Sequence, residues 1–236
     1  MSQPLLSVEG INVFYGASQI LFDVGFQVEQ GQVVALLGRN GAGKSTTFKA
    51  IAGIAPPRSG EIRFRGARID GRPIYRIARA GIGYVPEDRQ VFPEHTVEDN
   101  LVIAHKKGPN GEPWTLERVY EVFPILAGMK KRMAGRLSGG EQQMLTIART
   151  LMGNPALILL DEPTEGLAPI IVQKIAELIG QLHGMGVTIL MAEQNMHFCL
   201  RVATHAVVID KGVVVYRDTI EGLRANDDIK QRYLSV

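Results

Sequence analysis

The sequence has little of several features that would each point to a particular class of protein. Its 236 residues contain one cysteine, Cys199, which excludes a disulfide framework within the chain and is typical of a reducing compartment. No uninterrupted apolar run approaches the roughly 18 residues that a membrane-spanning helix requires. The N-terminus lacks the basic segment and the apolar stretch of a secretory signal peptide. These absences predict a soluble, cytoplasmic domain.

An excess of one charge sign is also lacking. The 26 Lys and Arg residues nearly balance the 24 Asp and Glu residues, so the formal net charge is +2. This balance gives no electrostatic reason to expect a nucleic-acid partner. Hydrophobic residues make up 45% of the chain and charged residues 21%, which is ordinary for a globular protein with room for a core.

Short apolar segments indicate an α/β fold. Residues 33–37 are all apolar, as expected for a strand of a parallel sheet that is covered on both faces. Further strands are expected at residues 6–13, 20–28, 61–65, 83–85, 156–160, 187–192, 206–209 and 213–216. Strict alternation along the first of them would place Leu6, Val8, Gly10 and Asn12 on one face and Ser7, Glu9, Ile11 and Val13 on the other.

Helical periodicity dominates between residues 96 and 152. Apolar residues recur there at the i, i+3, i+4, i+7 spacing of a helix that buries one side, as they do again across residues 171–182. Residues 108–113 have the composition of a loop, and residues 227–236 are expected to form a short terminal helix. The sequence therefore predicts a parallel-sheet core interrupted by a mostly helical insertion.

A phosphate-binding loop follows the apolar strand 33–37. Residues 38–45 fit the pattern G-x-x-x-x-G-K-[ST], and a helix is expected over residues 45–54. Backbone N–H groups of such a loop surround phosphate oxygens, the lysine reaches the β- and γ-phosphates, and the hydroxyl binds Mg²⁺. The residues predicted to bind the nucleotide here are Gly38, Arg39, Asn40, Gly41, Ala42, Gly43, Lys44, Ser45 and Thr46.

Two carboxylates, Asp161 and Glu162, end the apolar strand 156–160. Neighbouring residues on a strand point to opposite faces, but a backbone that turns into a loop at the strand end can bring both toward the phosphates. Asp161 is then predicted to hold Mg²⁺ together with Ser45, and Glu162 to polarise the attacking water.

Ser138, Gly139 and Gly140 open the helix that includes Met144 and Ile147. Ser138 is a natural N-cap, and two glycines leave the backbone N–H groups open to an anion. Taken alone, this segment is an ordinary capped helix start.

Three ordered motifs together resemble the ATP-binding cassette (ABC) ATPases, and the resemblance covers essentially the whole chain. These are the phosphate loop, the Leu-Ser-Gly-Gly-Glu-Gln-Gln segment at residues 137–143, and the apolar-Asp-Glu-Pro strand end at residues 157–163. The resemblance implies a P-loop NTPase fold with a parallel sheet core, an antiparallel β subdomain and an inserted helical subdomain. It implies a single ABC ATPase domain over residues 1–236, with residues 1–86 and 154–236 as the nucleotide-binding core and residues 87–153 as the helical subdomain.

The resemblance also implies how the site works. Two cassettes pair head to tail, so that Ser138, Gly139 and Gly140 act on the ATP held by the partner. Tyr15 matches the aromatic that stacks on adenine, with an ordinary strand aromatic as the alternative. Residues 165–167, directly after Glu162, match the loop that crosses the dimer interface.

Two positions depart from the commonest family pattern. Glu87 stands where a glutamine usually touches Mg²⁺ and water, and it keeps an oxygen ligand while adding a charge. Gln194 stands where a histidine usually contacts the γ-phosphate, and it offers an N–H donor but cannot relay a proton. With the segments at residues 91–93 and 165–169, these departures resemble the second ATPase subunit of importers for branched-chain amino acids.

That subgroup implies specific partners. They are a second ATPase subunit, identical or different, two membrane permease chains and, indirectly, an external solute-binding protein, which would place the chain on the inner face of the cell membrane. Phe92, with Val91 and Pro93, would face the permease or instead pack inward. The alternatives are an importer of urea, amides or aromatic acids, an exporter subunit, or an ABC ATPase without a transport function.

Overall fold

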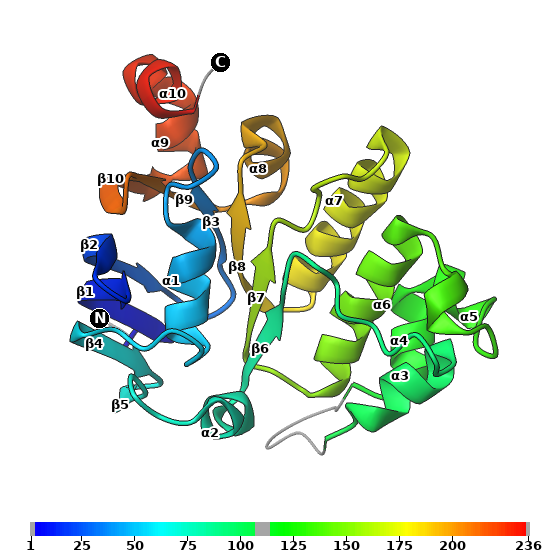
Figure 1. The fold of residues 1–236 in the computed structure, drawn as a ribbon. Helices are drawn as coiled ribbons and strands as arrows, with labels where there is room; N and C mark the ends of the chain where they lie inside the picture. The colour runs from blue at the N-terminus through cyan, green and yellow to red at the C-terminus, as the bar shows by residue number, and fades with distance from the viewer. Residues whose placement is uncertain (1–2, 107–113, 235–236) are drawn as a thin grey trace.

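The computed structural model describes residues 3–106 and 114–234, and in them two sheets lie beside a group of helices (Figure 1). The larger sheet has six strands in the order β10-β9-β3-β8-β7-β6. Its strands are β10 (Val213–Thr219), β9 (His205–Asp210), β3 (Val33–Leu37), β8 (Thr188–Glu193), β7 (Leu157–Asp161) and β6 (Ile82–Val85). All neighbours pair in parallel except β9 and β10. This order brings the carboxyl ends of β3, β8 and β7 to one edge of the sheet.

The smaller sheet has four antiparallel strands in the order β2-β1-β4-β5. Its strands are β2 (Ser18–Val28), β1 (Leu6–Tyr15), β4 (Ser59–Phe64) and β5 (Ala67–Arg68). Together the two sheets match the fold class expected from the sequence, a parallel core with an antiparallel β subdomain. Figure 1 shows β1, β2 and β4 beside α1, at the end of the molecule away from α3 to α6.

The expected alternation along β1 is wrong beyond Glu9. Leu6, Val8, Ile11 and Val13 all belong to one buried cluster. The register of β1 against β2 shifts between Val8 and Ile11, and Gly10 between them has a φ of +58°. A bulge adds one residue to one strand, so every residue after it changes face. Gly10 allows this because it adopts a left-handed backbone without a steric penalty.

Ten α-helices and one 3-10 turn lie between the strands and after them in the described residues. Those of the sheet-bearing part are α1 (Lys44–Ile51), α2 (Ile74–Ala80), α7 (Pro169–Gly184), α8 (Met196–Val202), α9 (Ile220–Ala225) and α10 (Asp227–Tyr233). Those between β6 and β7 are α3 (Val97–Ile103), α4 (Leu116–Val122), α5 (Pro124–Ala127) and α6 (Gly139–Met152), with a 3-10 turn at Ala134–Arg136. The loop expected at residues 108–113 lies outside the described residues. No described helix combines the length and the apolar character needed to cross a bilayer.

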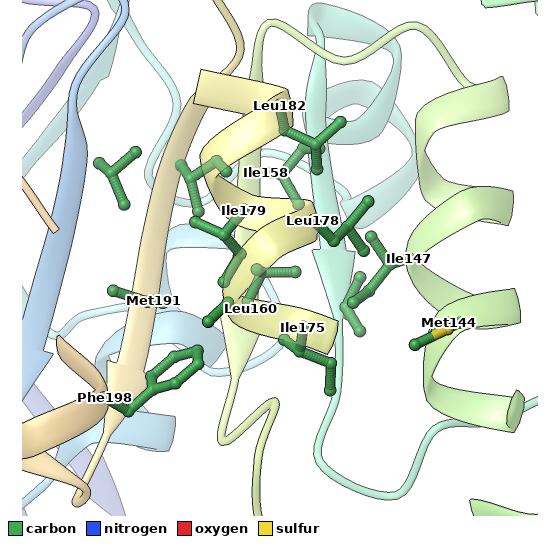
Figure 2. Packing of buried hydrophobic residues seen from close by; sticks show 14 of the residues in the cluster. Met144, Ile147, Ile158, Leu160, Ile175, Leu178, Ile179, Leu182, Met191 and Phe198 are labelled. Atoms are coloured by element: carbon green, nitrogen blue, oxygen red, sulfur yellow. The ribbon is translucent and has the colours of Figure 1, made fainter. Parts of the chain in front are cut away.

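The core around the site forms where α7 covers the parallel sheet (Figure 2). Ile175 and Ile179 of α7 face Leu160 of β7 and Met191 of β8, and all four side chains are fully or almost fully buried. Each such side chain contributes about 1.5–3 kcal/mol by leaving water. The expected helical spacing across residues 171–182 therefore holds, and the packing fixes the strand ends that carry the polar residues described next.

Candidate functional site

The predicted phosphate loop joins the end of β3 to the start of α1. Gly43 precedes α1 with a φ of +109°, a backbone conformation that favours glycine. Lys44 is 4% exposed, and its ammonium donates to the carbonyl oxygens of Gly38 at 2.8 Å and Arg39 at 3.2 Å. Two carbonyl oxygens at the start of the loop thus hold the lysine ammonium.

Both strand-end carboxylates meet this loop. The Ser45 hydroxyl donates to Asp161 Oδ1 at 2.9 Å, and Lys44 Nζ lies 2.9 Å from Glu162 Oε1. Glu162 has a left-handed φ of +47°, and its N–H donates to the carbonyl oxygen of Ala192 at 3.0 Å. This turn breaks the strand alternation at residue 162, so two neighbouring side chains reach the same loop.

Burial sets the electrostatics of the two carboxylates. It raises the pKa of Asp161, although hydrogen bonds from Ser45 and from the Tyr84 hydroxyl, at 3.0 Å from Oδ2, oppose the effect. Burial also raises the pKa of Glu162, and the bond to Lys44 opposes that shift. Of these two buried carboxylates only Glu162 has an ammonium partner, so the pair favours the arrival of further positive charge.

The donor set suits Mg²⁺ better than a soft metal. Ser45 and Asp161 supply a hydroxyl and a carboxylate in hydrogen-bond contact, and Mg²⁺ prefers one or two such oxygen ligands together with substrate phosphates and water. Among the described residues there is no group of three or more His, Cys, Asp or Glu side chains that could hold a metal by itself. The residues present therefore fit an ion that arrives with a phosphate.

A cavity of about 380 Å³ opens over the loop. It is lined by Tyr15, Ile20, Asn40, Gly41, Gly43, Lys44, Ser45, Thr46, Glu87, Glu162 and Glu165. The volume lies within the range of small-molecule sites. Two residues distant in sequence from the loop, Tyr15 and Glu87, are thereby brought to it, and the Tyr15 side chain is 48% exposed.

Other predicted site residues lie elsewhere. Gln194 lines a separate cavity of about 230 Å³, together with Gly38, Arg39 and residues of α8. Ser138 caps α6 by accepting from the N–H of Glu141, whose side chain accepts from the N–H of Ser138 in return. Neither Ser138 nor the two glycines after it line the cavity over the phosphate loop.

Gly140, in the first turn of α6, is buried directly against α7. A Cβ at this position would lie 2.6 Å from Ile171 Cγ2. A glycine at residue 140 leaves room for the Ile171 side chain of α7 to pack directly against the first turn of α6.

Phe92 points outward rather than into the core. Its side chain is 43% exposed, and the Arg149 guanidinium lies 4.7 Å from the ring centroid. Asn100 holds the Phe92 backbone, donating to its carbonyl oxygen at 3.0 Å and accepting from its N–H at 2.9 Å. Of the two alternatives left open by the sequence, the outward orientation is the one observed.

Sequence reasoning missed two polar residues at this edge of the sheet. Tyr84 bonds Asp161 from β6, and its position in a strand gave no sign of that. Glu193 ends β8 and is 1% exposed, and its carboxylate accepts from Thr164. The available signal for Glu193 was its position, because it is a charged residue directly after the expected apolar strand 187–192 and next to Gln194.

Comparisons with known proteins agree with this geometry. The sequence profile of the ABC transporter family matches residues 21–165. The chain is 42% identical over 231 residues to the high-affinity branched-chain amino acid transport ATP-binding protein BraG of Pseudomonas aeruginosa, covering 98% of this chain and 99% of that protein. It is 33% identical to the lipopolysaccharide export system ATP-binding protein LptB of Escherichia coli K12, over 97% of this chain and 96% of that one. The crystal structure of the ADP conformation of MJ1267, an ATP-binding cassette of an ABC transporter, superposes with a TM-score of 0.84 at 26% identity and covers 98% of both chains.

Proposed function

Because this chain belongs to the ABC transporter family, in which ATP hydrolysis drives transport, we propose that it energises an importer of branched-chain amino acids. The observation that carries the proposal is the 42% identity to BraG over almost the full length of both chains. Identity to the lipopolysaccharide export protein LptB is lower, at 33%. An exporter is therefore the second candidate, and importers of urea, amides or aromatic acids remain variants of the first.

We propose that the cavity over the phosphate loop holds the triphosphate of ATP. Lys44 would contact the β- and γ-phosphates, while the backbone N–H groups of residues 38–46 surround them. Tyr15, exposed at the rim of the cavity, would stack on adenine. Glu87 lines the same cavity and would face the γ-phosphate end.

For hydrolysis, Glu162 is the proposed residue that orients and polarises the attacking water. Its raised pKa makes it a better proton acceptor than an exposed glutamate. Ser45, Asp161 and Glu87 would hold Mg²⁺, which neutralises charge on the β- and γ-phosphates when bound. Gln194 would donate its side-chain N–H to the γ-phosphate from the neighbouring cavity.

ABC ATPases act as dimers with membrane permease components, and our finer proposals concern that assembly. Ser138, Gly139 and Gly140 would contact the ATP bound by a second ATPase subunit, identical to this chain or different from it. Residues 1–86 and 154–236 would form the nucleotide-binding core and residues 87–153 the helical subdomain. The chain would lie on the cytoplasmic face of the membrane, with two permeases and an external solute-binding protein, and without nucleic acid.

Reconstitution tests the transported solute. The chain would be co-expressed with the permease and binding-protein genes that neighbour its own, and the complex would be placed in liposomes with ATP inside. We expect leucine-loaded binding protein to stimulate ATP hydrolysis and leucine uptake, and a Lys44→Ala complex to do neither. Stimulation by urea or an aromatic acid alone, or by lipopolysaccharide, would identify that solute, instead of a branched-chain amino acid, as the one transported.

A further inference from the structure

Glu193 occupies the point where three segments around the proposed reaction site meet. It ends β8, and its backbone carbonyl oxygen accepts from the N–H of Gly38, the first glycine of the phosphate loop, at 3.4 Å. Its side chain lies between the loop that follows Glu162 and the turn at residues 194–195. No role for this residue follows from the motifs described above.

The first contact of the Glu193 carboxylate is with Thr164, two residues after Glu162. The Thr164 hydroxyl donates to Oε1 at 2.6 Å, and the Thr164 N–H donates to the same oxygen at 3.2 Å. All of these atoms are buried. Since the N–H of Glu162 donates to Ala192 in the same strand as Glu193, β8 holds the backbone of Glu162 and of Thr164 at two points.

The second contact is with the turn that carries Gln194. Glu193 Oε2 accepts from the N–H of Asn195 at 3.3 Å, and the Asn195 side chain in turn accepts from the N–H of Phe198 at the start of α8. Gln194, between Glu193 and Asn195, is therefore fixed on both sides while its own side chain is exposed.

We propose that Glu193 is a positioning residue of ATP hydrolysis: its carboxylate holds the loop after Glu162 and the turn of Gln194 in one fixed arrangement around the γ-phosphate. The proposal rests on the function proposed above, because it concerns the same site. A carboxylate accepts three donors at once, which neither a histidine nor an apolar residue at this position could do. Where Glu193 is ionised, its hydrogen bonds are charge-assisted, and such bonds are shorter and stronger than bonds to a neutral acceptor.

The groups around Glu193 show that burying its carboxylate is energetically costly. Burial raises the pKa of Glu193 to about 7, and the nearby Glu162 adds to the shift while the Thr164 hydrogen bond opposes it. The charged and titratable groups that face it are Glu162 beyond β7, itself paired with Lys44 of α1, and Cys199 of α8. A residue that served packing alone would not need a charge here.

The test compares turnover with ATP binding in the full chain. Glu193→Gln keeps the shape and one oxygen acceptor, but it turns an amide N–H toward the N–H of Asn195. We expect kcat to fall roughly 10- to 100-fold, as for a small displacement of reacting groups. We expect the Kd for ATP to stay within about twofold of wild type, because the triphosphate contacts are untouched. Glu177→Gln, an exposed glutamate on α7, is the matched control.

Two results would overturn the proposal for Glu193. One is a Glu193→Gln kcat within about threefold of wild type, and the other is an equal loss of turnover and ATP binding, which marks a purely structural role. Failure of the wild-type chain to bind ATP would instead overturn the proposed function, and this inference with it.

A second pair of variants tests the same bond without altering the buried charge. Thr164→Val removes the hydroxyl that donates to Glu193, and Thr164→Ser returns a hydroxyl to the same place. We expect a several-fold lower kcat for the valine variant and near wild-type kcat for the serine variant, about three- to tenfold apart. In the double variant with Glu193→Gln, the two losses should not multiply, because both remove one interaction. Equal kcat values for Thr164→Val and Thr164→Ser would contradict the proposal.

Discussion

The ammonium of Lys44 lies 2.9 Å from the carboxylate of Glu162, and the two side chains are only 4% and 8% exposed. A phosphate group that takes Lys44 as its partner has to displace Glu162 from it. The same event would leave Glu162 without its cation and able to accept a hydrogen bond from water. In the proposed function, binding of the triphosphate and activation of the carboxylate would thus be coupled through one ion pair.

Replacing Lys44 should abolish nucleotide binding. In Lys44→Ala we expect ATP affinity to fall by about 100-fold or more, because the buried ammonium is lost and Glu162 remains unpaired. Equilibrium binding of a fluorescent ATP analogue measures this. Lys174→Ala, on the exposed side of α7, serves as the control and should bind as wild type does. Unchanged affinity in Lys44→Ala would remove the basis of the proposed site.

Glu162→Gln should separate binding from chemistry. The amide keeps the shape but cannot accept a proton, so kcat should drop by about 10²- to 10⁴-fold while ATP still binds. Size-exclusion chromatography with ATP should then show a dimer that the wild-type chain forms only transiently. A Glu162→Gln chain that turns over normally would assign the general base to another residue.

Tyr15 should matter for affinity rather than for turnover. Tyr15→Ala should raise the KM for ATP by about tenfold through loss of base stacking, whereas Tyr15→Phe should leave it unchanged. Steady-state kinetics with kcat and KM resolved distinguish the two variants. Tyr75→Ala removes an aromatic of similar exposure on α2 and should have no effect on KM. If both tyrosine-to-alanine variants behave alike, Tyr15 is an ordinary strand aromatic.

The Phe92 side chain should contact the permease. Phe92→Asp replaces an exposed apolar ring by a carboxylate. We therefore expect co-purification with the permease to be lost while ATP binding is kept. Val213, which is 44% exposed on β10, gives the matched control Val213→Asp. Retained co-purification of the Phe92→Asp chain would move the docking surface elsewhere.

Glu193 should give the stability of the protein a specific pH dependence. Its pKa is about 7 in the folded chain against the usual 4.5, so between these values the folded state holds a proton that the unfolded state has lost. The contribution of Glu193 to the free energy of unfolding is therefore fully present below pH 4.5. It is lost as the pH rises from 4.5 through 7, by up to about 3 kcal/mol. Denaturant unfolding at pH 5 and pH 8 should show this decrease in wild type and in Glu177→Gln. In Glu193→Gln the decrease should be smaller by that amount, and an unchanged pH slope would contradict the origin assigned to it.

Local patterns predicted the parts of this molecule that depend on near neighbours in sequence. The apolar run at residues 33–37 identified a buried strand, and the glycine pattern after it predicted a loop around Lys44. Asp161 and Glu162 could be placed beside that loop because a backbone that turns into a loop at a strand end can bring two neighbouring side chains to the same side.

Contacts between distant segments could not be predicted in the same way. Tyr84 bonds a residue 77 positions away, and Glu193 bonds one 29 positions away, so neither contact leaves a local pattern. The bulge at Gly10 escaped notice because a glycine within a strand is compatible with regular alternation as well as with its interruption. Only the register against β2 and β4 distinguishes the two.

The close approach of Gly140 to Ile171 affects how variants of the glycine pair should be interpreted. Any side chain at residue 140 has to displace the Ile171 side chain of α7, whether or not it also obstructs an incoming nucleotide. Inactivity of a Gly140→Ala protein is therefore poor proof of direct ATP contact at that residue. The adjacent Gly139 is the more informative choice, because what lies nearest to it is the end of the flexible Arg89 side chain, which can move aside.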